Sequence, residues 1–334
     1  MILHPLHASA FDRVAVVLIL ATALMRVGPT IAAEFNLPPR GTDVVGEVRI
    51  VISRQQDTLL DIARKHDLGF NEITAANPSV DPWLPGEGTR VVLPTQFVLP
   101  PGPREGIVIN LAQLRLYYFP AAAAGHPRSV QTHPIGIGVD YSSTPLGTTR
   151  VLRKAVDPVW YPPAQIREER AQDSKPLPRV VPAGPENPLG KYALYLGFSG
   201  YLIHGTNRPW GIGMRVSHGC IRMNPEDIES LHRLVPVGTP VRIVDEPYFV
   251  GALGGTAYLQ AFRTPDAPAE ENLTPLVRTI LQAMPRQAKV DWNKATSVAS
   301  AKRGIPVPLS AGTPGMDEIL ANARRVDDGN GEGQ

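Results

Sequence analysis

One short segment, residues 201–224, constrains the fold of this 334-residue chain more than any other. It reads YLIHGTNRPWGIGMRVSHGCIRMN and contains the only cysteine, Cys220. Residues 192–205, YALYLGFSGYLIHG, predict two strands joined by a turn at Ser199-Gly200, the second ending at His204. Asn224 followed by Pro225 predicts the start of a helix, because asparagine caps helices well and proline suits the first helical position. We therefore expect Cys220 on a loop between a strand end and a helix.

The residues around Cys220 are those that activate a thiol. The thiolate is the nucleophilic form, and an ordinary cysteine with a pKa of about 8.5 is mostly protonated at neutral pH. Imidazoles, guanidinium groups and a helix N-terminus favour the thiolate, and His204, His218, Arg215 and Arg222 supply the first two. A buried inert cysteine is one alternative. A zinc site formed by His204, His218 and Cys220 is another, although there is no second cysteine to complete it.

The rest of the composition favours a mostly-β protein. The chain has 35 prolines, and many short alternating stretches are separated by turn residues. We expect a β-sandwich or flattened barrel with a few helices. A net charge of +2 is too small to indicate a nucleic-acid partner.

The N-terminal segment, residues 1–33, resembles a signal peptide. One arginine precedes an apolar run that is too short to span a bilayer, and Ile31-Ala32-Ala33 offers a small-residue cleavage site. An uncleaved membrane anchor is the alternative. Export would place the protein in the periplasm or cell wall, where a lone cysteine has no internal partner and is kept for its reactivity.

The remaining chain divides into successive units. Residues 34–46 and 95–103 are expected to be linkers, residues 104–245 the catalytic domain, and residues 246–334 a partly helical extension with a disordered end. A proline-rich stretch, residues 157–189, is expected to be a long loop. It forms either a wall of the substrate site or a surface excursion.

Residues 47–94 predict a β-α-α-β unit. Its Asp57-Thr58-Leu59 and Asn77-Pro78 sequences resemble those of a LysM module, although Gln56 stands where that family usually has glycine. The resemblance implies binding of glycan strands in the wall. A packing domain without glycan affinity is the alternative.

The cysteine segment resembles the active-site signature of the L,D-transpeptidases, the YkuD-domain family, in its ErfK/YbiS-like branch. The resemblance rests on His204-Gly205-Thr206 and on the run from Ser217 to Arg222, which reads SHGCIR. It implies that Cys220 attacks a tetrapeptide stem of peptidoglycan at the bond between the third residue's L-centre and D-alanine. The thioester is then transferred to an amine, on another stem or on a wall-anchored lipoprotein.

The resemblance also implies roles for individual residues. At rest Cys220 gives its proton to His204, the Gly205 carbonyl fixes the tautomer of His204, and His218 acts as an electrostatic and positioning group rather than as a second base. Backbone N–H groups around Gly219 form the oxyanion hole. The substrate-binding group comprises Arg222, which binds the donor carboxylate, with Arg215, Ser217, Asn224 and Thr206; no cofactor or metal is expected.

Three other functions remain open. A hydrolase would use the same thioester with water as acceptor, as in a carboxypeptidase or a cross-link hydrolase. A non-catalytic wall-binding protein would rely on the LysM-like unit, and the absence of thiol labelling by a carbapenem would reveal it. A thiol redox or metal-handling protein would show bound metal or peroxide reactivity without acylation.

Overall fold

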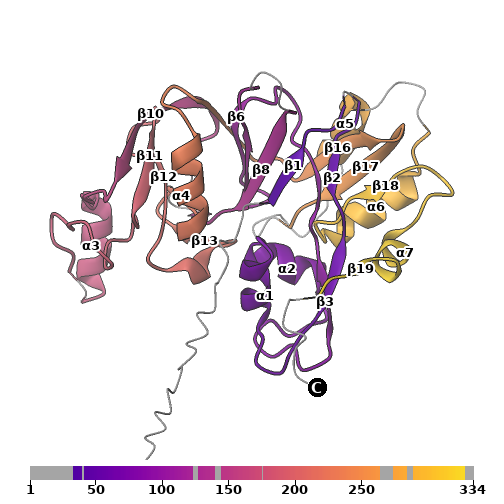
Figure 1. Cartoon of the computed structure of the whole chain (residues 1–334), viewed down its shortest axis with the longest axis horizontal. Coiled ribbons are helices and arrows are strands. Elements are labelled where there is room, and N and C mark those ends of the chain that lie inside the picture. Colours follow the sequence, from indigo (N-terminus) through magenta and orange to yellow (C-terminus); the bar gives the residue numbers. More distant parts are fainter. Residues whose placement is uncertain are drawn as a thin grey trace, which may run out of the picture.

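The computed structural model describes residues 33–39, 41–122, 127–139, 144–174, 176–263, 274–283 and 289–327. The mostly-β fold is confirmed (Figure 1). The signal-peptide prediction for residues 1–32 and the disorder predicted for residues 328–334 lie outside the described residues. Among the described residues, every helix is too short or too polar to cross a bilayer.

One nine-stranded sheet forms the centre of the molecule. Its strand order is β1 (Ala33–Asn36), β8 (Ser129–Pro134), β7 (Arg115–Phe119), β6 (Gly106–Asn110), β15 (Pro240–Val244), β10 (Gly147–Val156), β11 (Tyr192–Leu196), β12 (Leu202–His204) and β14 (Ile221–Arg222). β6 and β7 form the predicted hairpin, and all five residues of each are buried. Strands buried along their whole length have both faces covered, so this sheet carries two cores.

The two faces of β6 and β7 contribute to different cores. On one face Ile107 and Leu116 join Ile228 and Leu231 of α4 (Pro225–Leu234), the helix that starts at Asn224 as predicted. On the other face Val108 and Tyr117, with neighbouring residues, pack against the N-terminal unit and the C-terminal hairpin.

The N-terminal unit has the predicted order of elements: β3 (Arg49–Ile52), α1 (Leu59–Lys65), α2 (Phe70–Ala76) and β4 (Arg90–Leu93). Thr58 caps α1 in a capping box with Asp61. Leu59, Ile73 and Leu93 share a core with Val108 and Tyr117 of the main sheet. The unit is therefore packed into the body of the protein and is not a module tethered by linkers.

The two expected linkers were predicted wrongly. Residues 34–46 contribute β1 to the main sheet and β2 (Val44–Gly46), and residues 95–103 contribute β5 (Gln96–Val98), which pairs with β2. Their proline and glycine residues lie between these strands, and side chains such as Phe97 are buried in the shared core. β1, β2 and β5 are too short to show the alternation of polar and apolar residues by which a strand is predicted from sequence.

The C-terminal extension packs against the rest of the chain. It contains β16 (Tyr248–Leu253), β17 (Thr256–Ala261), α5 (Thr274–Ala283), α6 (Trp292–Ala301), β18 (Val307–Pro308), α7 (Met316–Ala321) and β19 (Arg324–Arg325). α7 ends at Ala321, because the next residues turn and pair β19 in parallel with β3. Leu320 and Ile305 join Ile50 of the N-terminal unit in a small core.

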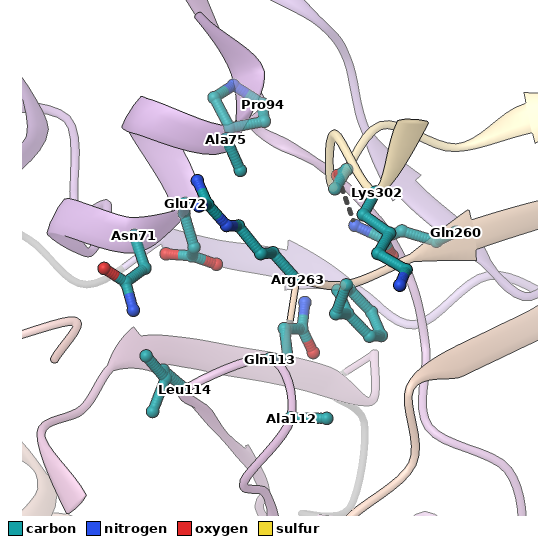
Figure 2. A pocket seen from close by; sticks show the side chains of 12 residues that line it. Asn71, Glu72, Ala75, Pro94, Ala112, Gln113, Leu114, Gln260, Arg263 and Lys302 are labelled. Atoms are coloured by element: carbon teal, nitrogen blue, oxygen red, sulfur yellow. Dashed lines mark hydrogen bonds between the residues drawn. The ribbon is translucent and has the colours of Figure 1, made fainter. Parts of the chain in front are cut away.

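A small pocket lies between the N-terminal unit, the β6–β7 turn and the C-terminal extension. It has a volume of about 20 Å³ and contains none of the candidate catalytic residues. Figure 2 shows Asn71 and Glu72 of α2 on one side, the β6–β7 turn with Gln113 on another, and Gln260 and Lys302 of the C-terminal extension opposite.

Candidate active site

The predicted catalytic residues come together at the edge of the main sheet. His204 ends β12, and Cys220 lies between β13 (Arg215–Ser217) and β14. β12 and β14 are parallel neighbours in which Ile203 pairs with Ile221. This pairing brings the residue before Ile221, Cys220, alongside the strand that ends at His204.

The His204 ring is held by backbone carbonyls. Its Nδ1 lies 2.6 Å from the Gly205 oxygen, as predicted for the residue that fixes the tautomer. A carbonyl can only accept, so Nδ1 carries the hydrogen and Nε2 keeps the lone pair of a base. Burial, with the Arg222 guanidinium, lowers the pKa of His204 to about 3, while the carbonyls of Gly205 and Leu189 act in the opposite direction.

The Cys220 thiol is partly exposed, and its Sγ donates to the Gly200 carbonyl at 3.7 Å. Burial raises the pKa of the Cys220 thiol, against smaller opposing effects of the Leu202 backbone N–H and Arg222. Burial therefore acts against the charged form of both Cys220 and His204. The expected resting thiolate–imidazolium pair stays a prediction.

The loop that carries Cys220 is fixed by two hydroxyl groups. Ser217 donates to the Cys220 carbonyl at 2.6 Å, and Thr144 donates to the Gly219 carbonyl at 2.8 Å. In a trans peptide the C=O and the following N–H point in opposite directions, so the Cys220 N–H points away from Thr144. No described residue accepts a hydrogen bond from the N–H groups of Gly219 and Cys220. These donors suit a developing oxyanion.

Gly219 needs to be glycine. Its φ is +100°, in the left-handed region where a side chain strains the backbone. This conformation lets the loop turn between His218 and Cys220.

The five predicted substrate-binding residues separate by exposure: Arg222 and Arg215 are half-buried, and the other three are buried. Arg222 is half-buried and its Nε has no hydrogen-bond partner among the described residues. Burial lowers the pKa of Arg222, and Arg208 adds to this effect. Arg215 begins β13, which pairs with β9 (Ile137–Gly138).

The other three of these residues are almost fully buried, and their side chains bond within the chain. Ser217 holds the Cys220 carbonyl, Thr206 accepts from the Arg208 N–H at 2.9 Å, and Asn224 donates to Asp227 at 2.9 Å. These contacts position the loop, and the predicted role of the three residues in substrate binding stays a prediction.

The proline-rich stretch before β11 lies at the site. It contains α3 (Ala164–Gln172), whose residues are all at least partly exposed. Glu169 of α3 bonds to Nε2 of His218 at 2.8 Å. This contact favours the substrate-wall interpretation of residues 157–189 over the surface excursion.

The N-terminal unit also supports the site. The N–H groups of Phe70 and Asn71 bond to the carbonyls of Ile212 and Gly213, just before the catalytic loop. A Cβ on Gly213 would lie 2.2 Å from the Phe70 nitrogen, so only glycine allows this approach. Sequence reasoning missed this support, as it missed Glu169, because neither lies within the motif.

Similar proteins were found over most of the chain. The family model of the L,D-transpeptidase catalytic domain, YkuD, matches residues 104–243. The probable L,D-transpeptidase ErfK/SrfK of Salmonella typhimurium is 40% identical over 300 residues, 86% of this chain and 94% of that protein. The probable L,D-transpeptidase YbiS of Escherichia coli is 40% identical over 288 residues, 84% of this chain and 92% of that protein. A solved L,D-transpeptidase of Mycobacterium tuberculosis H37Rv aligns with 48% of this chain and 64% of its own, at 20% identity and a TM-score of 0.30.

Proposed function

The chain belongs to the YkuD family of L,D-transpeptidases, and we propose that Cys220 is the nucleophile of its acyl transfer and His204 the base. The single observation that carries the proposal is the bond between His204 Nδ1 and the Gly205 carbonyl. It leaves the basic nitrogen of a buried, neutral imidazole on the strand beside Cys220. A nucleophile on a loop with its base on a rigid strand is the arrangement that thiol acyl transfer needs.

The donor is a tetrapeptide stem of peptidoglycan. Cys220 Sγ attacks the carbonyl that joins the third residue's L-centre to D-alanine, and the thiol proton passes to His204 as the C–S bond forms. His204 then gives this proton to the leaving D-alanine amine, the C–N bond breaks, and a thioester remains. Burial acts against charge on both Cys220 and His204, which supports transfer of the proton during attack rather than before it.

Charge that develops on the attacked oxygen meets backbone donors. The N–H groups of Gly219 and Cys220 are available, and one such donor contributes about 3–4 kcal/mol in related acyl transfers. Arg222 binds the donor carboxylate, because a guanidinium forks onto a carboxylate through two hydrogen bonds. The Arg222 charge lies close enough to Cys220 to lower the pKa of the thiol, which supports this assignment.

An amine resolves the thioester. It attacks with His204 as base, and the new amide releases Cys220. The acceptor is the diaminoacid of a second stem, which gives a 3→3 cross-link, or a lysine of a wall-anchored lipoprotein.

Product analysis separates transfer from hydrolysis. The full chain is supplied with soluble tetrapeptide and an increasing concentration of a diaminoacid-containing acceptor. We expect cross-linked product in proportion to acceptor, with free tripeptide a minor product. Tripeptide as the main product at every acceptor concentration would instead support the hydrolase.

The N-terminal unit binds glycan strands in this proposal. Trp83, between α2 and β4, is 55% exposed and stacks on Phe70 with ring centroids 5.5 Å apart. An exposed aromatic ring offers an apolar face to a sugar while its edge stays hydrated.

Deleting the unit would break the shared core, so a surface substitution is the better test. We expect Trp83→Ala to reduce sedimentation of the full chain with insoluble wall while activity on soluble stem stays normal. Trp292→Ala, which removes an exposed tryptophan from α6, is the matched control. Equal wall binding by both variants and the unaltered chain would rule out this glycan surface.

The proposed location is outside the cytoplasm, in the periplasm or cell wall. The apolar segment within residues 1–33, the single cysteine and the wall substrate support it. Fractionation of the host with an antibody to the chain would test export.

A further inference from the structure

Three metal-ligating side chains meet inside the protein, apart from Cys220. Asp67 follows α1, His133 lies on β8, and Asp227 lies in the first turn of α4. All three residues are buried, and one potential ligand atom from each lies within 4.8 Å of the others. The cluster joins the N-terminal unit, the main sheet and the helix that follows the catalytic loop.

The atoms that face one another have no hydrogen-bond partners among the described residues. Asp67 uses Oδ2 to accept from the Ala33 N–H at 3.1 Å, and Asp227 uses Oδ2 to accept from Asn224 at 2.9 Å. Oδ1 of each carboxylate and both ring nitrogens of His133 remain unsatisfied. His133 Nδ1 lies 3.2 Å from Asp227 Oδ1 without the alignment of a hydrogen bond.

Such atoms are costly to bury without a partner. An unsatisfied buried polar atom costs about 1–3 kcal/mol, and more when it is charged. One oxygen of each aspartate accepts a hydrogen bond that fixes the carboxylate in place. The other oxygen has no hydrogen-bond partner among the described residues.

The charges of the cluster also lack balance. Arg115 is fully buried, but its guanidinium forks onto Glu72 at 2.7 and 2.8 Å and reaches only the backbone oxygen of Asp67. The cluster and its neighbour Glu72 bring together three carboxyl groups, one guanidinium and one imidazole. A divalent cation would add positive charge where carboxyl groups are in excess.

We propose that Asp67, His133 and Asp227 bind one divalent transition-metal ion, with Zn²⁺ as the first candidate. Two carboxylate oxygens and an imidazole are hard and borderline donors, a set that Zn²⁺ accepts at about 2.0–2.2 Å and that also suits Mn²⁺. The three atoms now lie within 4.8 Å of one another, so a bound ion would draw them closer together. The site is independent of the acyl-transfer proposal, and the sequence alone predicted no metal.

One member of the cluster borders a cavity. A pocket of about 450 Å³ is lined by Asp67, His66 and Ala33, among others.

The ion would act as a structural clamp. Asn224, which precedes α4 by one residue, already bonds to Asp227. Fixing Asp227 to Asp67 and His133 would therefore hold the start of α4, and with it the end of the catalytic segment, against the N-terminal unit.

Metal analysis of the full chain tests the proposal. The protein is purified without chelator or affinity-tag metal, and its zinc and manganese are measured by mass spectrometry. We expect about one ion per chain. Removing it should lower the Tm, and returning Zn²⁺ at saturating concentration should raise the Tm by about 4 °C or more. A metal-free chain whose Tm does not respond to Zn²⁺ or Mn²⁺ would overturn the proposal.

Variants locate the ion. His133→Gln should lose the metal, while His232→Gln, a matched change on the outer part of α4, should keep it. Cys220→Ala must also keep it, and Co²⁺ added to that variant should give visible absorption that His133→Gln lacks. If His133→Gln fails to fold, Asp227→Asn replaces it. Metal retained by folded His133→Gln, or lost from Cys220→Ala, would contradict the assignment.

Discussion

Glu169 and His218 are hydrogen-bonded at 2.8 Å across the gap between α3 and the catalytic loop. The bond with His218 holds the pKa of the Glu169 carboxyl below its usual value. No residue of α3 is buried, and this contact links the proline-rich stretch to the residue two before Cys220. Through this bond His218 connects the catalytic loop to α3, which forms part of the wall of the site.

Breaking this pair should weaken catalysis modestly. We expect Glu169→Ala to lower kcat/KM for soluble stem by up to about fivefold, the scale of an exposed ion pair, mostly through KM. Glu168→Ala is the control, because Glu168 neighbours Glu169 on the same helix and is exposed. Identical kinetics for the two variants would show that α3 is not held over the site by Glu169.

Gly219 should be essential for chemistry but not for stability. A side chain at its φ of +100° costs about 1–2 kcal/mol and would turn the Cys220 N–H away from the oxyanion. We expect Gly219→Ala to reduce the acylation rate at least about tenfold. Gly238→Ala, at φ +92° in the turn before β15 with open space around it, is the control with a similar backbone conformation. The account fails if both variants acylate at the rate of the unaltered chain.

Arg222 should act on the thiol as well as on the substrate. Since Arg222 lowers the pKa of Cys220, Arg222→Met should raise that pKa further. We expect the pH profile of iodoacetamide alkylation to move to higher pH. Stem acylation should fall by about tenfold or more through the lost charged hydrogen bonds. Arg233 is an exposed arginine on α4, so Arg233→Met should leave the alkylation profile and the acylation rate unchanged. An alkylation profile that does not move in Arg222→Met would refute the effect of Arg222 on the thiol.

The acylation rate should show no step near pH 6.5. His204 has a pKa lowered to about 3, so its basic form persists as the pH falls from 8 to 5. An ordinary imidazole base would lose activity through protonation near its usual pKa of about 6.5. Rates of thioester formation over this range measure the effect. A step near 6.5 that persists in His218→Gln would show that His204 titrates normally.

The catalytic core of the site could be predicted because its signals are local. Strand alternation ending at His204, the Gly219-Cys220 turn and the Asn224-Pro225 helix start all lie within one segment. The hydrogen bonds that Ser217, Thr206 and Asn224 make within the chain could not be predicted, because sequence does not reveal whether a hydroxyl or amide bonds to the protein or faces solvent.

Long-range packing could not be predicted in the same way. Glu169 lies in a proline-rich stretch with no periodicity, and its partner is 49 positions away. Asp67, His133 and Asp227 come from three separate elements, and each alone looks like an ordinary turn, strand or helix-cap residue. The strand pattern of β6 and β7 showed apolar residues but not that Leu59 and Ile228 cover opposite faces.

Intact-protein mass spectrometry with a soluble tetrapeptide tests the central claim most directly. The full chain should gain the mass of the tripeptide acyl group, with D-alanine released, and peptide mapping should place the thioester on Cys220. Cys220→Ala should gain nothing, and a carbapenem should label the same thiol. An unmodified chain under conditions where Cys220→Ala still binds the stem would contradict acyl transfer by Cys220 and leave a wall-binding protein.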